Sequence, residues 1–461
     1  MQLTGAQRLH SDAVQRLRDS YQAIPAGSPV RLAKRTSNLF RSRASTRHPG
    51  LDVSGLTGVL QVDPTTRTAD VAGMCTYENL VAATLPHGLT PLVVPQLKTI
   101  TLGGAVSGLG IEAASFRNGL PHESVLALDV LTGAGEIVTT TPGDELFAGF
   151  PNSYGTLGYA TRLRIELEPV RSCVALHHVR FNDLDELCGA VAQIMASREW
   201  DGEHVDYLDG VLFSRTESYL TLGRRTEQPA GGAGKPVPAS DYTGRQIYYH
   251  SIQQRAHDVL SIHDYLWRWD TDWFWCSGAF GVQHPVIRRL WPARWRRSDV
   301  YWKLVALDQR LDLSNRIEVW RGRPRQERVV QDVEIPVERT AEFLRWFVAH
   351  VGITPVWLCP LRLRDERRWP LYPLKPGRDY VNVGFWSTVP IAAGGSCGDI
   401  NRAIEHQVDA VGGHKSLYSD SFYTREEFDA RYGGERYAAL KQRYDPDRRL
   451  LDLYAKAVRR R

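Results

Sequence analysis

The chain has 461 residues, 43% of them hydrophobic, and this length suits two or three domains with large cores. The net charge of +5 comes with no dense basic stripe, which argues against a nucleic-acid partner, and the six cysteines are too scattered for a metal site. The sequence holds no signal peptide and no run of about 20 apolar residues of the kind that spans a membrane. We therefore expect a cytoplasmic protein, at most in peripheral contact with the inner face of the membrane.

The N-terminal part of the chain is predicted to be rich in strands. Residues 159–167 alternate between apolar and charged side chains, which is typical of a half-buried strand. Thr76 is suited to cap a helix, and Gly88 is suited to end it. The predicted elements in chain order are a helix over 1–24 with Leu9, Val14 and Leu17 on one face, a strand over 30–40, a hairpin of 59–63 and 68–72, a helix over 77–85, and strands over 125–131 and 159–167.

The stretch 95–112 is the most informative part of the sequence. It carries Gly103, Gly104, Gly108 and Gly110 among small and hydroxyl residues. Glycine lets another molecule approach the main chain closely, and backbone N–H groups in such a loop bind phosphate. The glycine spacing fits neither the Rossmann fingerprint nor the Walker loop. The stretch is predicted to be a diphosphate-binding loop, and a purely structural glycine-rich turn is the alternative.

The second half of the chain mixes helical and strand-like segments. Residues 229–238 are rich in glycine and proline and carry no folding signal, so they are predicted to be an insertion, with a lid as the alternative. The other predicted elements are a helix over 188–195, two strands within 202–222, a strand over 329–336, a helix over 338–351, and strands over 356–359 and 380–385.

The segment 265–302 is dense in aromatic side chains, with arginines between them. Aromatic and basic residues together are favoured at lipid headgroups. They are also found where a tryptophan-rich core has arginines on its solvated face, and for the individual residues this second interpretation is slightly favoured. The segment as a whole is consistent with an enzyme that collects a lipid from a bilayer.

Two ordered sets of motifs resemble known proteins. The first set is Leu51-Asp-Val-Ser-Gly-Leu56, Thr101-Leu-Gly-Gly104, Leu128-Asp-Val-Leu-Thr-Gly133, Asp144-Glu-Leu-Phe147 and Ser153-Tyr-Gly-Thr-Leu-Gly158. It resembles the FAD domain of the vanillyl-alcohol-oxidase superfamily, which is also called PCMH-type. The second set is Thr36-Ser-Asn-Leu-Phe-Arg41, Gly110-Ile-Glu112, Asp209-Gly-Val-Leu-Phe-Ser214, Val330-Gln-Asp-Val-Glu-Ile-Pro336, Pro355-Val-Trp-Leu-Cys-Pro360 and Tyr423-Thr-Arg-Glu-Glu-Phe428. It is similar to the Δ24-sterol reductases.

The resemblance implies an α+β fold with a two-subdomain FAD-binding domain and a substrate domain. The N-terminal part of the FAD domain is expected over 1–170. The substrate domain, an antiparallel sheet with helices on one face, is expected over 171–400 and includes the segment 265–302. Residues 401–461 are expected to return to the FAD domain.

The resemblance also implies FAD as the cofactor. Many relatives carry a histidine that bonds covalently to the flavin in the loop after the first strand. No histidine lies between Val30 and Arg47, so non-covalent FAD is expected. The FAD-binding residues implied by the resemblance are Thr36, Ser37, Asn38, Thr101, Leu102, Gly103, Gly104, Ser107, Gly108, Gly110, Ile111, Glu112, Ser115, Gly119, Val125, Gly158 and Tyr418.

The implied chemistry is redox, and two residues are candidates for catalysis. Many oxidases of the superfamily have a histidine near the end of the glycine stretch, where this chain has Ile111 and Glu112, and this favours reduction. Glu112 is the candidate proton donor, because a carboxyl group in an apolar pocket can stay protonated near neutral pH. Its alternative role is to bind the flavin or the loop backbone. Tyr418 lies in a segment that resembles the one beside the isoalloxazine ring and is expected to contact FAD or substrate.

These observations predict an NADPH-dependent flavoenzyme that reduces an isolated carbon–carbon double bond in a lipid. The double bond is expected in a methylene-branched fatty acyl chain or in a sterol side chain. One alternative is an FAD-dependent alcohol or sugar oxidase or dehydrogenase, which acts on another small molecule. The other alternative is a non-catalytic protein that retains FAD and binds a lipid.

Overall fold

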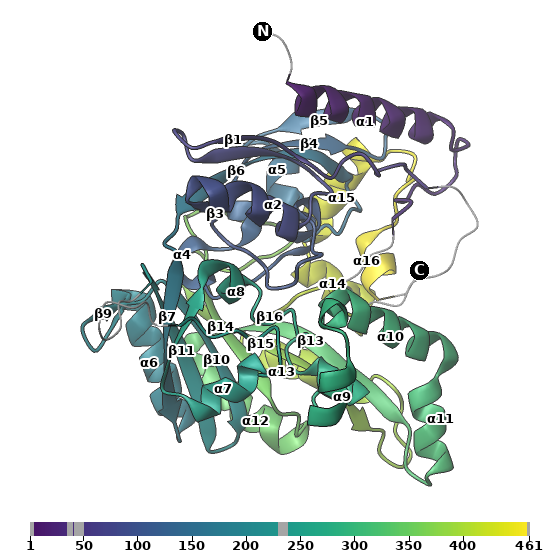
Figure 1. Ribbon diagram of the computed structural model, residues 1–461. Coiled ribbons are helices and arrows are strands. Elements are labelled where there is room, and N and C mark those ends of the chain that lie inside the picture. Colours follow the sequence, from purple (N-terminus) through teal and green to yellow (C-terminus); the bar gives the residue numbers. More distant parts are fainter. Residues whose placement is uncertain (1–3, 35–39, 41–49, 229–237, 459–461) are drawn as a thin grey trace.

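The computed structural model describes residues 4–34, 40, 50–228 and 238–458 (Figure 1). In these residues two antiparallel sheets and the helices around them form the predicted α+β fold. Residues 229–237 of the predicted excursion and residues 35–39 of the predicted strand at 30–40 lie outside the described residues. Leu32, within the predicted strand, forms an isolated bridge with Leu51. None of the helices in the described ranges is long and apolar enough to cross a bilayer.

The first sheet lies in the upper half of Figure 1 and has the strand order β1-β2-β6-β4-β5, with β3 paired to β6. The central strand β6 follows the predicted alternation, since Leu163 and Ile165 are fully buried and Arg164 between them is exposed. Burying each such side chain stabilises the fold by roughly 1.5–3 kcal/mol. The strands are β1 (Val59–Asp63), β2 (Thr68–Ala72), β3 (Leu89–Pro91), β4 (Val125–Leu131), β5 (Ile137–Thr140) and β6 (Tyr159–Pro169).

Helices flank this sheet, and side-chain caps start three of them. The hydroxyl oxygens of Thr4 and Thr76 accept hydrogen bonds from the first turns of α1 and α2, as the sequence predicts for Thr76. Helix α1 buries Ala13 and Leu17, but Leu9 is 69% exposed, so its predicted place on the buried face is wrong. The helices are α1 (Gly5–Gln22), α2 (Tyr77–Thr84), α3 (Leu102–Gly108), α4 (Ser115–Asn118) and α5 (Glu145–Gly149).

Helix α3 occupies part of the stretch that was predicted to be a loop. The Thr101 hydroxyl accepts a hydrogen bond from the Gly104 N–H at 3.3 Å and starts the helix. A Cβ on Gly103 would lie 2.6 Å from the carbonyl oxygen of Gly73, so only glycine allows α3 to pack this closely against the end of β2. This close packing offsets the poor helix propensity of glycine, which is why composition alone predicted a loop.

The second sheet lies in the lower half of Figure 1 and has the order β12-β7-β11-β10-β14-β15-β13-β16. Its two longest strands, β13 and β15, pair antiparallel from Gln326↔Pro390 to Pro336↔Tyr380. The strands are β7 (Cys173–Phe181), β10 (Tyr207–Ser214), β11 (Glu217–Thr226), β12 (His257–Ser261), β13 (Gln326–Pro336), β14 (Val356–Arg362), β15 (Asp379–Pro390) and β16 (His414–Lys415), with a separate pair of β8 (Glu199–Trp200) and β9 (Glu203–His204).

The two faces of the second sheet have different partners. Helices α6 (Leu184–Ser197), α12 (Val337–His350) and α13 (Asp399–Ala410) cover one face and share a hydrophobic core with it. On β13 this face carries Val333 and Ile335. Because side chains alternate along a strand, Asp332 and Glu334 lie on the other face, which is turned toward the first sheet.

The C-terminal part of the chain is divided between the two sheets. Helix α13 and strand β16 lie on the second sheet, so residues 401–415 still belong to it and the chain returns to the first domain only after Lys415. The Lys441 ammonium group in α15 then donates hydrogen bonds to the carbonyl oxygens of Thr156 and Leu450 at 2.7 and 2.9 Å. The closing helices are α14 (Arg425–Arg431), α15 (Gly434–Tyr444) and α16 (Leu453–Ala457).

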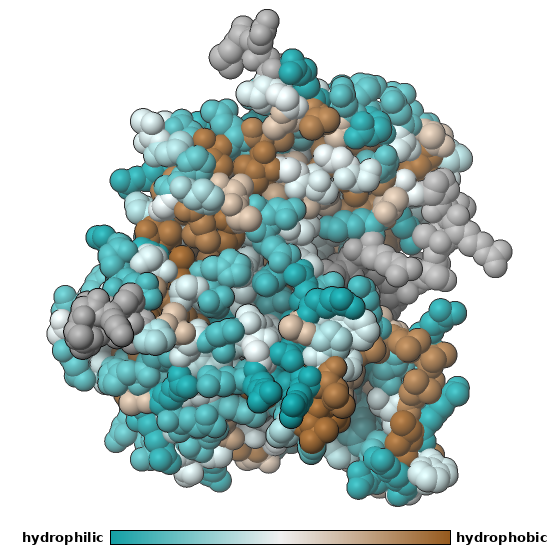
Figure 2. Space-filling view, in the orientation of Figure 1, coloured by the Kyte–Doolittle hydropathy of each residue, from teal (hydrophilic) through white to brown (hydrophobic). Residues whose placement is uncertain are grey.

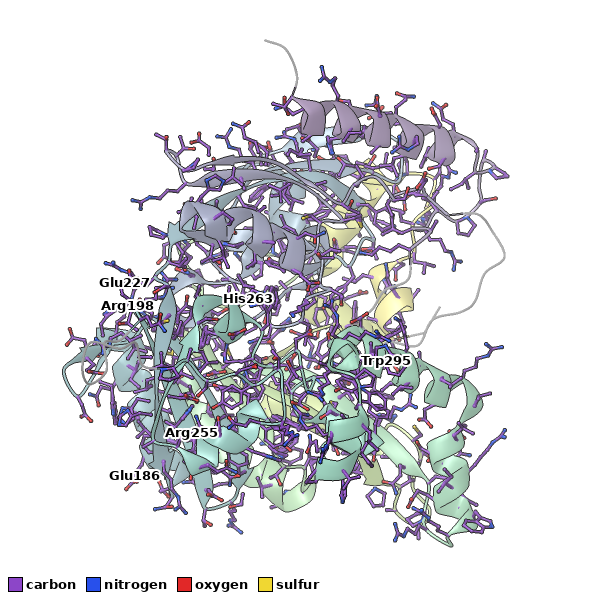
Figure 3. The ribbon with its side chains drawn as sticks, viewed as in Figure 1. Glu186, Arg198, Glu227, Arg255, His263 and Trp295 are labelled. Carbon is purple, nitrogen blue, oxygen red and sulfur yellow. The ribbon has the colours of Figure 1, made fainter. Side chains whose placement is uncertain are left out.

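A largely helical excursion lies before β13. Trp267, Trp269 and Trp273, in its first half, are buried in the core between the sheets, as the core interpretation predicted. Trp295 lies at the surface beside α10, where Figure 3 labels it. The helices are α7 (Tyr248–Gln254), α8 (Ile262–Leu266), α9 (Pro285–Leu290), α10 (Ser298–Leu311) and α11 (Leu313–Trp320).

Candidate functional site

A cleft with a volume of about 460 Å³ lies between the two sheets. This volume falls within the range of about 300–1,000 Å³ that is usual for ligand and cofactor sites. The first domain lines it with Arg31, Lys34, Phe40, Met74, Gln96, residues 99–101, 103–105 and 107–111, Tyr154, Gly155 and residues 158–160. The second sheet, the helical excursion and the C-terminal part line it with Trp273, Phe274, Cys276, Asp332, Trp357, Trp386, Ser416, Tyr418, Leu451 and Lys456.

Glycines of α3, together with Gly110 and Gly158, line the cleft on the side of the first domain. A Cβ on Gly108 would lie 2.9 Å from the Tyr154 ring, and a Cβ on Gly110 would lie 2.8 Å from Pro95. Gly158 has a φ of +141° and packs against the backbone of Leu131, so a side chain there would be strained. The wall therefore consists of main chain and small groups, which leaves room for a flat ligand to lie against it.

The structure places most of the predicted FAD-binding residues on the cleft. Those that line it are Thr101, Gly103, Gly104, Ser107, Gly108, Gly110, Ile111, Gly158 and Tyr418. Five others lie behind this wall and do not line it, namely Leu102, Glu112, Ser115, Gly119 and Val125. Thr36, Ser37 and Asn38 are outside the described residues.

Glu112 is held in a buried network away from the cleft lining, which is a correction to its predicted role. Its Oε1 lies 3.1 Å from Arg268 Nη2 and accepts a hydrogen bond from Gln96 at 3.3 Å, while Oε2 accepts one from the Ala114 N–H. The same Arg268 nitrogen lies 2.9 Å from Asp209 Oδ2. Burial raises the pKa of Glu112, and the Arg268 guanidinium offsets part of that shift. The alternative role of binding loop backbone describes Glu112 better than proton donation does.

Among the described residues that line the cleft, Asp332 carries the carboxyl group, and the sequence interpretation did not single it out. Desolvation raises the pKa of Asp332 to about 7, and hydrogen bonding with Asn382 and Tyr418 offsets only part of this shift. Gly384 lies opposite Asp332 on β15, and a side chain there would collide with its carboxylate oxygen. The Val330–Pro336 motif could have pointed to Asp332, because side chains alternate along a strand and the carboxylate therefore lies on the face opposite Val333.

Tyr418 lies beside Asp332 on the same side of the cleft. Its hydroxyl oxygen accepts a hydrogen bond from Trp386 Nε1 at 2.7 Å. Burial keeps the pKa of Tyr418 well above its usual range, so the phenol stays protonated at neutral pH. The structure thus joins the predicted residue Tyr418 with two residues that were not predicted, Asp332 and Trp386.

Aromatic rings surround this pair. Phe274 lies 4.5 Å from Trp386 and 5.3 Å from Trp357, measured between ring centroids, and Trp273 stacks on Phe40 at 5.3 Å. Among the lining residues that the structure describes there is no histidine. The described lining therefore combines the Asp332 carboxyl group, the Tyr418 phenol beside it and an apolar aromatic wall, an arrangement suited to proton transfer with an apolar substrate.

Lys34 supplies positive charge elsewhere on the cleft wall. Its Nζ lies 3.8 Å from Met74 Sδ, and it forms no ion pair with any residue of the described ranges. Desolvation lowers the pKa of Lys34. An exposed ammonium group on the cleft wall whose contact is a thioether is suited to bind an anionic group of a ligand.

Comparisons with known proteins agree with this geometry. A family model described as an FAD binding domain matches residues 14–141. The Delta(24)-sterol reductases of Homo sapiens and Arabidopsis thaliana are 24% and 23% identical over 96% and 90% of this chain, and over 85% and 77% of their own lengths. The chain is an FAD-binding oxidoreductase of the PCMH type. Cytokinin dehydrogenase 10 of Oryza sativa subsp. japonica is 34% identical over 34% of the chain and 28% of its own length.

The cleft of this FAD-binding oxidoreductase fits its cofactor. Lys34 could hold the negative charge of the diphosphate, and Gly103, Gly104 and Gly108 line the cleft with main chain that the cofactor could approach closely. Both the resemblance to PCMH-type FAD enzymes and the use of FAD are thereby confirmed. In the part of the chain that is described, no cluster of three or more His, Cys, Asp or Glu side chains is placed to hold a metal.

Proposed function

We propose that the protein reduces an isolated carbon–carbon double bond in a lipid, with NADPH as the hydride donor to FAD. Bound FAD supplies hydride transfer. The observation that carries the proposal is Asp332, a carboxyl group on an apolar cleft wall whose pKa lies near 7. Such a group is protonated in part of the molecules at neutral pH, as a proton donor to an alkene must be.

Different residues of the cleft would have different roles in such a reaction. A hydride adds to one carbon of the double bond, and Asp332 donates its proton to the other, so the product gains two hydrogens and the Asp332 carboxylate is left. Tyr418 would hold that carboxylate by hydrogen bonding, and the Trp386 N–H fixes the orientation of Tyr418. The surrounding rings would exclude water, so that fixed dipoles stabilise developing charge more than they would in bulk solvent.

The aromatic wall and the relatives support a lipid as substrate. An isolated double bond offers no carbonyl group to be polarised, so recognition must come from apolar contact. Trp273, Phe274 and Trp357 supply such contact. Two substrates match this apolar wall and the isolated double bond, namely a methylene-branched fatty acyl chain and a sterol side chain. The similarity to proteins named Delta(24)-sterol reductase supports reduction as the class of reaction.

The same carboxyl group supports one second candidate. With a pKa near 7, Asp332 is also ionised in part of the molecules and could accept a proton while a hydride leaves an alcohol or amine. The chain would then be a dehydrogenase or oxidase, and its similarity to a protein named cytokinin dehydrogenase favours this candidate.

Product analysis in heavy water tests the proposal. The purified protein with NADPH is given methylene-branched fatty acids, Δ24-sterols, simple alcohols and sugars, and the products are identified by mass spectrometry. The proposal expects a saturated lipid with one deuterium from the solvent at the carbon that Asp332 protonates. If both lipid classes are unchanged while an alcohol is oxidised, the dehydrogenase or oxidase function replaces the proposed reductase function. If FAD is bound but nothing turns over, the protein is a non-catalytic lipid binder.

A further inference from the structure

Helices α9, α10 and α11 carry an unusual concentration of exposed apolar side chains. Of the thirteen large hydrophobic residues that are exposed in the described ranges, ten lie between 286 and 320. Leu290 is 77% exposed and Trp320 is 85% exposed. We call this set the α9–α11 surface, and it consists of Val286, Ile287, Leu290, Trp295, Leu307, Leu311, Leu313, Ile317, Val319 and Trp320. In Figure 2 its aliphatic members form brown patches at the lower right, with hydrophilic side chains between them.

The apolar residues follow helical spacing, so they form stripes. On α11, Leu313, Ile317 and Trp320 are four and three residues apart and therefore share one face. On α10, Leu307 and Leu311 are four residues apart. Apolar stripes at the surface mark sites of interaction, because leaving them in water has a free-energy cost.

The charge of the chain is concentrated in the same segment. Residues 285–325 hold 11 of the 57 Lys and Arg residues and only 4 of the 52 Asp and Glu residues, a net charge of +7. The rest of the chain then has 46 basic and 48 acidic residues, a net charge of −2. The basic excess of the whole protein thus lies beside its exposed apolar stripes.

Part of this charge is free to bind an anionic partner. Arg289, Arg294, Arg310 and Arg316 are exposed and form no ion pair with a residue that the structure describes. A second copy of the chain is a poor partner for this surface, because it would bring the same positive charge against it. Lipid headgroups with negative charge match it, and a helix with leucine and tryptophan on one face and arginine on the other is suited to the bilayer interface.

We propose that the α9–α11 surface docks onto an anionic lipid bilayer, with the apolar stripe of α11 in the headgroup region. The contact differs from the one that the sequence suggested, since Trp295 is the one exposed tryptophan of 265–302 and the exposed residues extend to Trp320. The excursion that carries this surface also supplies Trp273, Phe274 and Cys276 to the cleft. Docking would bring the cleft close to lipids, but the proposal does not depend on the reaction.

Vesicle flotation with the full-length FAD-bound protein tests it. The vesicles are phosphatidylcholine alone or phosphatidylcholine mixed with phosphatidylglycerol. The variants are Leu313→Ser/Ile317→Ser/Trp320→Ser for the apolar stripe and Arg310→Ala/Arg316→Ala for the charge. Matched controls on α1 are Leu9→Ser, another exposed apolar residue, and Arg8→Ala/Arg18→Ala. Circular dichroism and the flavin spectrum verify that each variant is folded.

The expected result is binding to the anionic vesicles that weakens with salt. Each arginine removed should lower the partition coefficient by about fivefold at low salt, and the triple variant should abolish flotation, while both α1 controls bind like the wild type. The proposal is overturned if the wild type does not float with anionic vesicles, or if the folded triple variant floats equally well. It is also overturned if the triple variant instead abolishes a dimer that size-exclusion chromatography detects in the wild type.

Discussion

Replacing Asp332 with asparagine should make the protein more stable at alkaline pH. The folded-state pKa of Asp332 is about 7, whereas an aspartate in an unfolded chain titrates near 3.9. Between these values the folded protein binds more protons than the unfolded chain, so this group lowers the stability as pH rises from about 4 to 7. Above pH 7 that loss is complete.

The size of the effect follows from the pKa difference. A shift of about 3 units corresponds to about 4 kcal/mol at 1.36 kcal/mol per unit. The Asp332→Asn variant, which cannot ionise, should match the wild type near pH 4 and exceed its unfolding free energy by up to about 4 kcal/mol near pH 8.

Urea unfolding across this pH range, at one fixed concentration of FAD, measures the difference. Asp12→Asn, at an exposed position on α1, is the charge-matched control. In the same preparations, loss of the proton donor should slow reduction of an alkene by about 10²–10⁴-fold, while reduction of the flavin by NADPH continues. A difference in unfolding free energy that stays constant from pH 4 to pH 8 would refute the assignment of a raised pKa to Asp332.

Three further substitutions test other parts of the site. Gly103→Ala places a Cβ 2.6 Å from a backbone carbonyl oxygen and should lower the free energy of unfolding by about 1–3 kcal/mol, as thermal or urea unfolding measures. Gly189→Ala, in open space on α6, is the control and should not destabilise the fold. Equal effects of the two substitutions would contradict the packing argument. Lys34→Met should weaken FAD binding by about 10-fold or more in fluorescence titration, since a charged hydrogen bond is worth about 1.5–3 kcal/mol; an unchanged Kd would remove Lys34 from the cofactor site. Arg268→Met leaves two carboxyl groups buried without their cation and should destabilise by about 3–5 kcal/mol in urea unfolding at neutral pH. An unchanged unfolding free energy would contradict the network.

Local patterns in the sequence predicted much of the fold. The hairpin of β1 and β2 and strand β4 lie where alternation and turn residues placed them, because these signals act over a few residues. Helix α3 was not predicted, since glycine has a poor helix propensity. What stabilises α3 is close packing against Gly73, which lies far from it in the sequence.

The chemistry of the site depended on contacts that are distant in the sequence. Glu112 was a reasonable candidate from its position after the glycines, but Arg268, which is 156 residues away, holds it in an ion pair. Asp332 became a candidate only when the second sheet placed it beside Tyr418 and the aromatic wall. A carboxyl group on a strand gives no sign in the sequence of how far its surroundings will raise its pKa.

The anaerobic absorbance spectrum of the FAD-bound protein tests the proposed function most directly. NADPH is added first and an alkene lipid second, without oxygen. The proposal predicts that NADPH removes the absorbance band of oxidised flavin and that a methylene-branched fatty acid or a Δ24-sterol restores it in the wild type, and far more slowly in Asp332→Asn. A flavin band that NADPH leaves unchanged and that an alcohol or amine removes would contradict the proposal.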